Sequence, residues 1–252
     1  MKFLGVALIV AAALIPSAAA GGGPAAALGV SPLRLELKAG TTEAITVRNP
    51  SAQPLVVRVT RAGFARTLHG KPRIKAARGT AAWLSILPHR RRLAPHASRK
   101  FWVTAKPPAG ARPGDHPALV LLATRPPADK QVHVLLRVGV VVLVRVAGTI
   151  VHDLVPQSLS IHRNGAARLF SLRLANRGNV AERIRGARLE LVLSRHGKSL
   201  ATLRARRLDL LPHSARIAVF AYRGAVHGPV LARVVFRPAA IGRPRSFRMM
   251  LP

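Results

Sequence analysis

The chain has 252 residues, and its 41 Lys and Arg residues against 8 Asp and Glu give it a formal net charge of +33. Apolar residues make up 49% of the sequence, which is enough to fill one large core or two ordinary ones and excludes a disordered polycation. Because the chain has no cysteine, disulfides, thiol catalysis and Cys-ligated metal sites are also excluded.

The N-terminal segment has the three parts of a Sec-type signal peptide. Met1 and Lys2 form a short positive region, residues 3–15 form an apolar run, and small residues follow. The apolar run is too short to anchor the chain in a bilayer, so we predict that residues 1–20 are removed and that residues 21–27 form a flexible leader. The predicted cleavage site consists of Ala18, Ala20 and Gly21.

No later segment is predicted to span a membrane. The most apolar one, residues 135–146, is interrupted by Arg137 and Arg145, whereas a spanning helix needs about 20 apolar residues. Its valines favour a strand, in which Gly139 would suit a bulge or a close approach of another chain segment. We therefore expect an extracytoplasmic protein without a transmembrane anchor, which is secreted, periplasmic or associated with the cell wall.

Apolar and polar residues alternate with a period of two in short segments along the whole chain, for example at residues 33–37, 45–49 and 172–174. This alternation places one set of side chains in a core and the other in solvent, as in an antiparallel sheet. No segment has the sustained apolar stripe of an amphipathic helix. The predicted fold class is all-β, built as a β-sandwich.

The sequence also repeats itself. The paired segments are 47–49 and 174–176, 93–99 and 210–216, and 114–116 and 227–229. Because these landmarks recur in the same order, we predict two tandem immunoglobulin-like sandwich domains, at residues 28–150 and 151–252. Histidines in the repeated loops, such as His96 and His213, are interpreted as replacements of turn glycines.

The first predicted domain carries an ordered series of short motifs. They are Val30-Ser31-Pro32, Asn49-Pro50, Trp83-Leu84, Leu93-Ala94-Pro95, Pro113-Gly114-Asp115-His116 and Arg137-Val138-Gly139-Val140. The series resembles the WxL-interacting-protein family of bacterial surface proteins, which implies a peptidoglycan-binding-type N-terminal domain. The same resemblance implies that Trp83 and Trp102 occupy core or strand positions rather than an exposed face. The chain is more distantly similar to PapD-like extracytoplasmic chaperones.

No residue pattern indicates an enzyme. The carboxylates are isolated from one another along the sequence, the ten histidines lack the spacing of metal ligands, and no nucleophile elbow or phosphate-binding glycine motif occurs. We therefore predict no catalytic residues, no metal site and no cofactor. Specific nucleic-acid binding is not expected either, because the chain is exported and lacks an aromatic stacking platform.

The distribution of charge gives the remaining functional signal. Residues 44–114 contain 15 Lys and Arg and no acidic residue, and within them residues 61–92 are interpreted as a long connection between strands. One interpretation is a surface for a cell-wall or other anionic envelope polymer; the alternative is a solvated face in an Arg-rich chain. The candidate polyanion-binding residues are Arg66, Lys71, Arg73, Lys75, Arg78, Arg90, Arg91 and Arg92.

Two functional hypotheses follow. The first is a non-enzymatic cell-surface or envelope binding protein, which engages an anionic envelope polymer or a surface protein. The second is a secreted PapD-like chaperone or assembly factor, which acts by β-strand addition to a client. A chaperone of this type would need paired basic residues in the cleft between its domains. The sequence predicts neither the ligand nor the oligomeric state.

Overall fold

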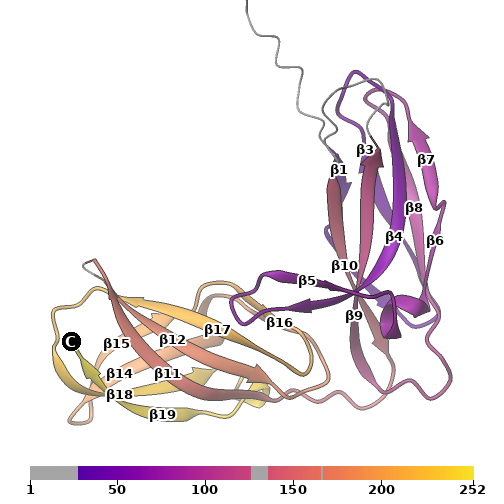
Figure 1. Ribbon diagram of the computed structural model, residues 1–252. Helices are drawn as coiled ribbons and strands as arrows, with labels where there is room; N and C mark the ends of the chain where they lie inside the picture. The colour runs from indigo at the N-terminus through magenta and orange to yellow at the C-terminus, as the bar shows by residue number, and fades with distance from the viewer. Residues whose placement is uncertain (1–27, 126–135, 166) are drawn as a thin grey trace, which may run out of the picture.

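The computed structural model describes residues 28–125, 136–165 and 167–252 (Figure 1). The predicted signal peptide, leader and cleavage site lie outside these residues. Within them the chain consists of strands, with short 3-10 turns at Gly79–Trp83, Gly186–Arg188 and Ala239–Ile241. No helix among the described residues is long and apolar enough to cross a membrane. The prediction of an all-β chain of two tandem immunoglobulin-like sandwiches is confirmed.

The first sandwich packs two sheets face to face. One sheet has the order β1 (Gly29–Ser31), β3 (Thr42–Arg48), β8 (Ser98–Ala105), β6 (Leu84–Leu87). The other has the order β2 (Arg34–Lys38), β10 (Arg137–Val146), β9 (Gly114–Arg125), β4 (Leu55–Arg66), β5 (Pro72–Lys75), with β7 (Arg90–Leu93) also on β4. Alternate residues of facing strands, such as Ile45, Phe101 and Val142, are fully buried between the sheets.

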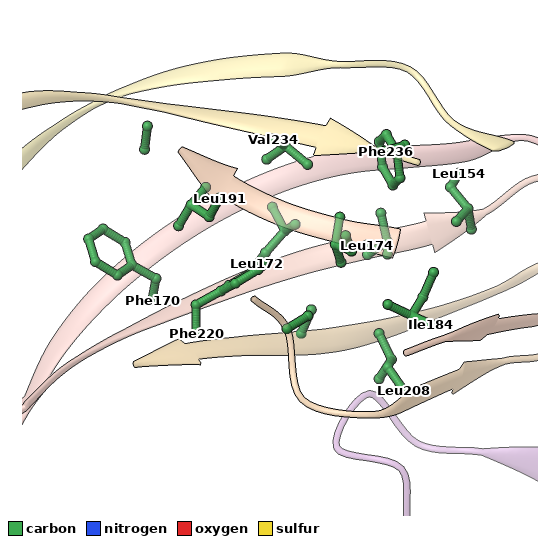
Figure 2. Close-up of a cluster of buried hydrophobic side chains, with 14 of the residues drawn as sticks. Leu154, Phe170, Leu172, Leu174, Ile184, Leu191, Leu208, Phe220, Val234 and Phe236 are labelled. Carbon is green, nitrogen blue, oxygen red and sulfur yellow. The ribbon is translucent and has the colours of Figure 1, made fainter. Parts of the chain in front are cut away.

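The second sandwich has a larger aromatic content in its core. Its sheets are β11 (Leu154–Asn164), β12 (Ala167–Asn176) and β17 (Ser214–Tyr222) on one side, and β15 (Lys198–Arg204), β14 (Leu189–Arg195), β18 (Gly228–Phe236) and β19 (Arg245–Leu251) on the other. A short pair joins β13 (Glu182–Ile184) to β16 (Leu208–Leu210). Figure 2 shows Phe170 and Phe220 among the leucines between the sheets. Burial of these side chains drives the two sheets together.

The internal repeat appears in the structure as the same buried hydrogen-bond network, built twice. Asn49 Nδ2 donates to Gln53 O at 2.7 Å and to Ala94 O at 3.1 Å, and its Oδ1 accepts from Ser51 N at 3.0 Å. In the second sandwich Asn176 makes the corresponding bonds at 2.7, 3.1 and 3.0 Å, with partners Val180 O, Leu211 O and Gly178 N. Each amide thus ties the end of one strand to the turn that starts another.

The histidines of the repeated turns occupy glycine-type backbone conformations. His96 has φ +56° and His213 has φ +52°, in the left-handed region that non-glycine residues enter only at a cost. The interpretation that they replace turn glycines agrees with this geometry. Gly139, in turn, makes the close approach expected of it, since a Cβ there would come within 3.2 Å of Leu119 Cδ1.

Two expectations were wrong. Residues 61–92 are not a long connection: β4 continues to Arg66, and β5, a 3-10 turn, β6 and β7 fill the rest. Gly63 and the alanines of this stretch have low strand propensity and hide the alternation. Trp102 is 48% exposed on the outer side of β8, whereas Trp83 is half-buried against His116, with ring centroids 4.7 Å apart.

Replacing the strained turn histidines should stabilise the protein. We expect His96→Gly and His213→Gly each to raise the free energy of unfolding by about 0.5–1 kcal/mol, because relief of the left-handed strain exceeds the extra unfolded-state entropy of glycine. The matched control is His162→Gly in the exposed part of β11, which should lower it by about 0.5–1 kcal/mol. Urea unfolding of the three variants measures this; a turn variant as destabilised as the control would contradict it.

Candidate functional site

An apolar cluster joins the two sandwiches. Its members on the first sandwich are Ala62, Phe64, Leu119, Leu121 and Leu143, and Leu211 is buried among them from the second. These side chains lie on the outer face of the β4–β9–β10 sheet, opposite the core of the first sandwich. Because the second sandwich covers part of this face, β9 and β10 are buried on both sides around Leu119, Leu121 and Leu143.

A buried carboxylate fixes the junction beside this cluster. Asp115, at the start of β9, is 6% exposed, and its Oδ2 accepts hydrogen bonds from Arg145 Nη2 at 2.9 Å and from Ala181 N at 2.8 Å. Its own N–H donates to Asn179 O at 2.7 Å. Hydrogen bonding to Asp115 raises the pKa of the Arg145 guanidinium above its ordinary value.

The Asn179 side chain completes this junction. Its Nδ2 donates to Pro113 O at 3.1 Å and to Thr149 O at 2.8 Å, and its Oδ1 accepts from Val151 N at 2.8 Å. Gly114 is required opposite it: with φ +120°, a Cβ would lie 2.3 Å from Asn179 O. One side chain therefore ties together the end of the first sandwich, the linker and the second sandwich.

The β4–β5 hairpin makes another contact between the sandwiches. Leu68, at its tip, accepts a hydrogen bond from Ile217 N of β17 at 2.9 Å, and Gly70 lies against the Arg216 guanidinium. Burial, with a smaller contribution from Arg66, lowers the pKa of Arg216. Figure 1 shows the hairpin reaching from the first sandwich to β16 and β17 across the bend of the molecule.

Strand β10 is covered along only part of its outer edge. It pairs with β9 along its whole length, whereas β2 pairs with it, in parallel, only from Val141 to Arg145. Val141 donates its N–H to Leu33 O at 3.0 Å, on the side of β10 that faces away from β9. In an antiparallel pair, every second residue turns its N–H and C=O groups to the same side, so those of Gly139 and Arg137 also face away from β9. None of the described strands pairs with β10 there, and these groups form an open sheet edge.

Two basic residues lie where this open edge meets the junction. Arg34 stands opposite Val141, the first residue of β10 that β2 covers, and its Nε donates to Glu36 Oε1 at 3.1 Å. Arg183 of the second sandwich contacts the same Glu36 oxygen. Burial, followed by repulsion from Arg183, lowers the pKa of Arg34. These are paired basic residues between the domains, which the sequence could not single out among 41 Lys and Arg.

The structure separates the candidate polyanion-binding residues into two groups. Arg66, Lys71, Arg73 and Lys75 lie on the β4–β5 hairpin, and Arg78 follows it. Arg90, Arg91 and Arg92 lie on β7, which pairs with the opposite end of β4. The centres of the two pairings are eight residues apart along β4, or roughly 26 Å in an extended strand, so the two groups of cations form separate patches.

The described residues offer no arrangement for metal chemistry. Among them, no three His, Asp or Glu side chains gather closely enough to hold a metal ion. Buried carboxylates are instead used in ion pairs, as in Glu190, which lies 3.1 Å from Arg237 Nε and 3.5 Å from Arg204 Nε.

Comparisons with known proteins concern the fold. No family model and no curated protein matches the chain. A chain from a solved chaperone–tip adhesin complex of CFA/I fimbriae biogenesis is similar with a TM-score of 0.51 and 13% identity, over 90% of this chain and 99% of that one. The Escherichia coli chaperone DraB and the Salmonella enterica SafA pilin–SafB chaperone complex give TM-scores of 0.45 and 0.46, with 16% and 14% identity, over 90% of this chain and 99% and 97% of theirs.

The likeness to the adhesin complex shows a shared two-domain immunoglobulin-like fold, of the class found in PapD-like pilus chaperones. This shared fold agrees with the resemblance to PapD-like extracytoplasmic chaperones, which was the more distant of the two seen in the sequence. The resemblance to the WxL-interacting family finds no support in these comparisons.

Removing the buried carboxylate at the junction should weaken the whole molecule. We expect Asp115→Ala to lower the free energy of unfolding by about 2–3 kcal/mol, because Ala181 N–H loses its acceptor and Arg145 its partner. Glu43→Ala, at an exposed carboxylate of β3, should change it by less than about 0.5 kcal/mol. Equal effects of the two substitutions in urea unfolding would contradict the role of Asp115.

Proposed function

We propose that the protein is a PapD-like chaperone or assembly factor, which acts outside the cytoplasm by adding an extended segment of a client protein to the open edge of β10. The observation that carries the proposal is this half-covered edge, where the outward N–H and C=O groups of Arg137 and Gly139 are paired with none of the strands that the structure describes. An exposed edge of this kind is a template for another strand.

The side chains of β10 indicate what the client strand would be. Val138 is half-buried and lies on the same face as Val140, which is fully buried in the core of the first sandwich. A strand added at this edge would extend that face, and its alternate residues would have to be apolar. Leu33, which is 60% exposed at the boundary of the edge, adds a further apolar contact.

Charge at the boundary of the edge suggests how the client would be held. Arg34 and Arg183 both contact Glu36, and Asp209 is a second carboxylate that acts on Arg34. The remaining N–H groups of the two guanidiniums could bind an acidic group on the client. The rigid junction around Asp115 would keep these cations at a constant distance from the open edge.

The comparisons support a protein client over a polymer. The similar chain of known structure comes from a chaperone–tip adhesin complex, and a surface subunit is the corresponding client for this protein. Such a role agrees with the predicted signal peptide, with an extracytoplasmic location and with a function that is not enzymatic. Binding of an anionic envelope polymer remains an expectation from the charge alone.

Blocking the open edge should abolish client capture without unfolding the protein. Arg137→Pro removes an N–H that faces the open side, where proline is tolerated in a sheet. We expect it to reduce by at least about tenfold the amount of client recovered from a cell-envelope extract of the source organism, since main-chain hydrogen bonds supply most of the affinity.

The matched control is Thr202→Pro on β15, an edge strand of the second sandwich. Ala205 N donates to Leu189 O of β14 at 3.2 Å, so Leu203 and Ala201 also turn their N–H groups toward β14. The N–H of Thr202, which lies between them, therefore points away from β14. This variant should capture client as the wild type does. Undiminished capture by Arg137→Pro, with both variants folded by circular dichroism, would refute strand addition at β10.

A further inference from the structure

An apolar row crosses the outer face of the β1–β3–β8–β6 sheet. Ala44 of β3 and Leu87 of β6 stand directly opposite Trp102 of β8, so the three side chains lie side by side. Leu87 is 58% exposed and Trp102 48%, and no described element covers them. A large aromatic and a leucine in solvent are costly unless another surface receives them.

The surroundings of this row are positive. Lys100 Nζ lies 5.7 Å above the Trp102 ring, and Arg48 is the next basic residue on the same face of β3. No Asp or Glu occupies an outward position of β3, β6 or β8. Glu43 pairs with the core residue Val103 and therefore lies on the other face of β3. On β7, Arg91 shares the face of the buried Leu93 and is exposed at the edge of the sandwich, whereas Arg90 and Arg92 lie on the outer face of the other sheet.

Arg91 of β7 borders the row along one edge of the sandwich. Leu87 ends β6, and only Pro88 and His89 separate it from Arg90. Figure 1 shows β6 and β7 following one another along that edge. Apolar groups that can enter an acyl layer thus stand next to cations that can reach its headgroups.

We propose that this face, defined by Leu87, Trp102, Lys100 and Arg48, docks on the surface of an anionic lipid bilayer. Tryptophan is favoured at the membrane–water interface, and each nearby Lys or Arg adds about 1 kcal/mol of attraction to anionic lipid. A second copy of the chain is not the occupant, because the same face would bring its cations together on a protein of net charge +33. A soluble polyanion would use the cations and leave Leu87 and Trp102 in water.

This docking is compatible with client binding. In the first sheet β6 lies at the end opposite β1, and in the second sheet the open edge of β10 is on the side of β2. The membrane face and the client edge are therefore at opposite edges of the first sandwich. The protein could hold a client while it rests on a bilayer.

The test uses the purified protein with vesicles of phosphatidylcholine alone and of equal parts of phosphatidylcholine and phosphatidylglycerol. Trp83 and Trp102 are its two tryptophans, and only Trp102 is at the proposed face. With anionic vesicles we expect co-sedimentation and a blue shift of tryptophan emission. Trp102→Ser should lose the shift and partition about tenfold more weakly, because the apolar area of the indole no longer enters the bilayer.

Two controls separate docking of this face on a bilayer from binding through other exposed leucines and from attraction to any polyanion. Leu231→Ser, at a 41% exposed leucine of β18 in the second sandwich, should bind anionic vesicles as the wild type does. Soluble polyphosphate serves as the polyanion without a bilayer. Equal binding of wild type and Trp102→Ser to anionic vesicles, a blue shift with phosphatidylcholine alone, or the same shift with polyphosphate would each overturn the proposal.

Discussion

The buried carboxylate of Asp115 is the interaction on which the arrangement of the molecule depends. It receives Arg145 from the neighbouring strand and a backbone N–H from the second sandwich, and so links the start of β9, the end of β10 and the other domain at one point. Leu211 then packs on the outer face of the same sheet. With the hairpin contact at Leu68, these interactions turn two tandem sandwiches into one bent body (Figure 1).

Burial on both faces explains the composition of β10. Val140, Val142 and Val144 face the core of the first sandwich, while Leu143 faces the cluster at the junction. A strand buried on both sides reads as a continuous apolar run instead of an alternating one. At Arg137 and Gly139, before this doubly buried stretch, β10 is exposed, and no described strand covers its edge there. A rigid edge of this kind loses little entropy when a partner strand binds.

Local patterns predicted much of the fold, and contacts between distant residues account for what was missed. Alternation and the repeated Asn and His positions predicted two sandwiches because each is a short-range constraint. The β4–β5 hairpin was missed because Gly63 and its alanine neighbours mask the alternation, and Trp102 because an exposed aromatic has the same pattern as a buried one. In the candidate site, Arg183 lies 147 positions from Glu36 in the sequence, and only the fold brings it to the carboxylate that Arg34 also contacts.

The central claim is that a client strand adds to β10 before β2 covers it. Backbone amide exchange by NMR, with and without captured client, measures it residue by residue. The account predicts that the client slows exchange of the Arg137 and Gly139 amides, which face the open edge, and leaves those of Val138 and Val140, already bonded toward β9, nearly unchanged. Unaltered exchange at Arg137 and Gly139 in a saturated complex would contradict the account.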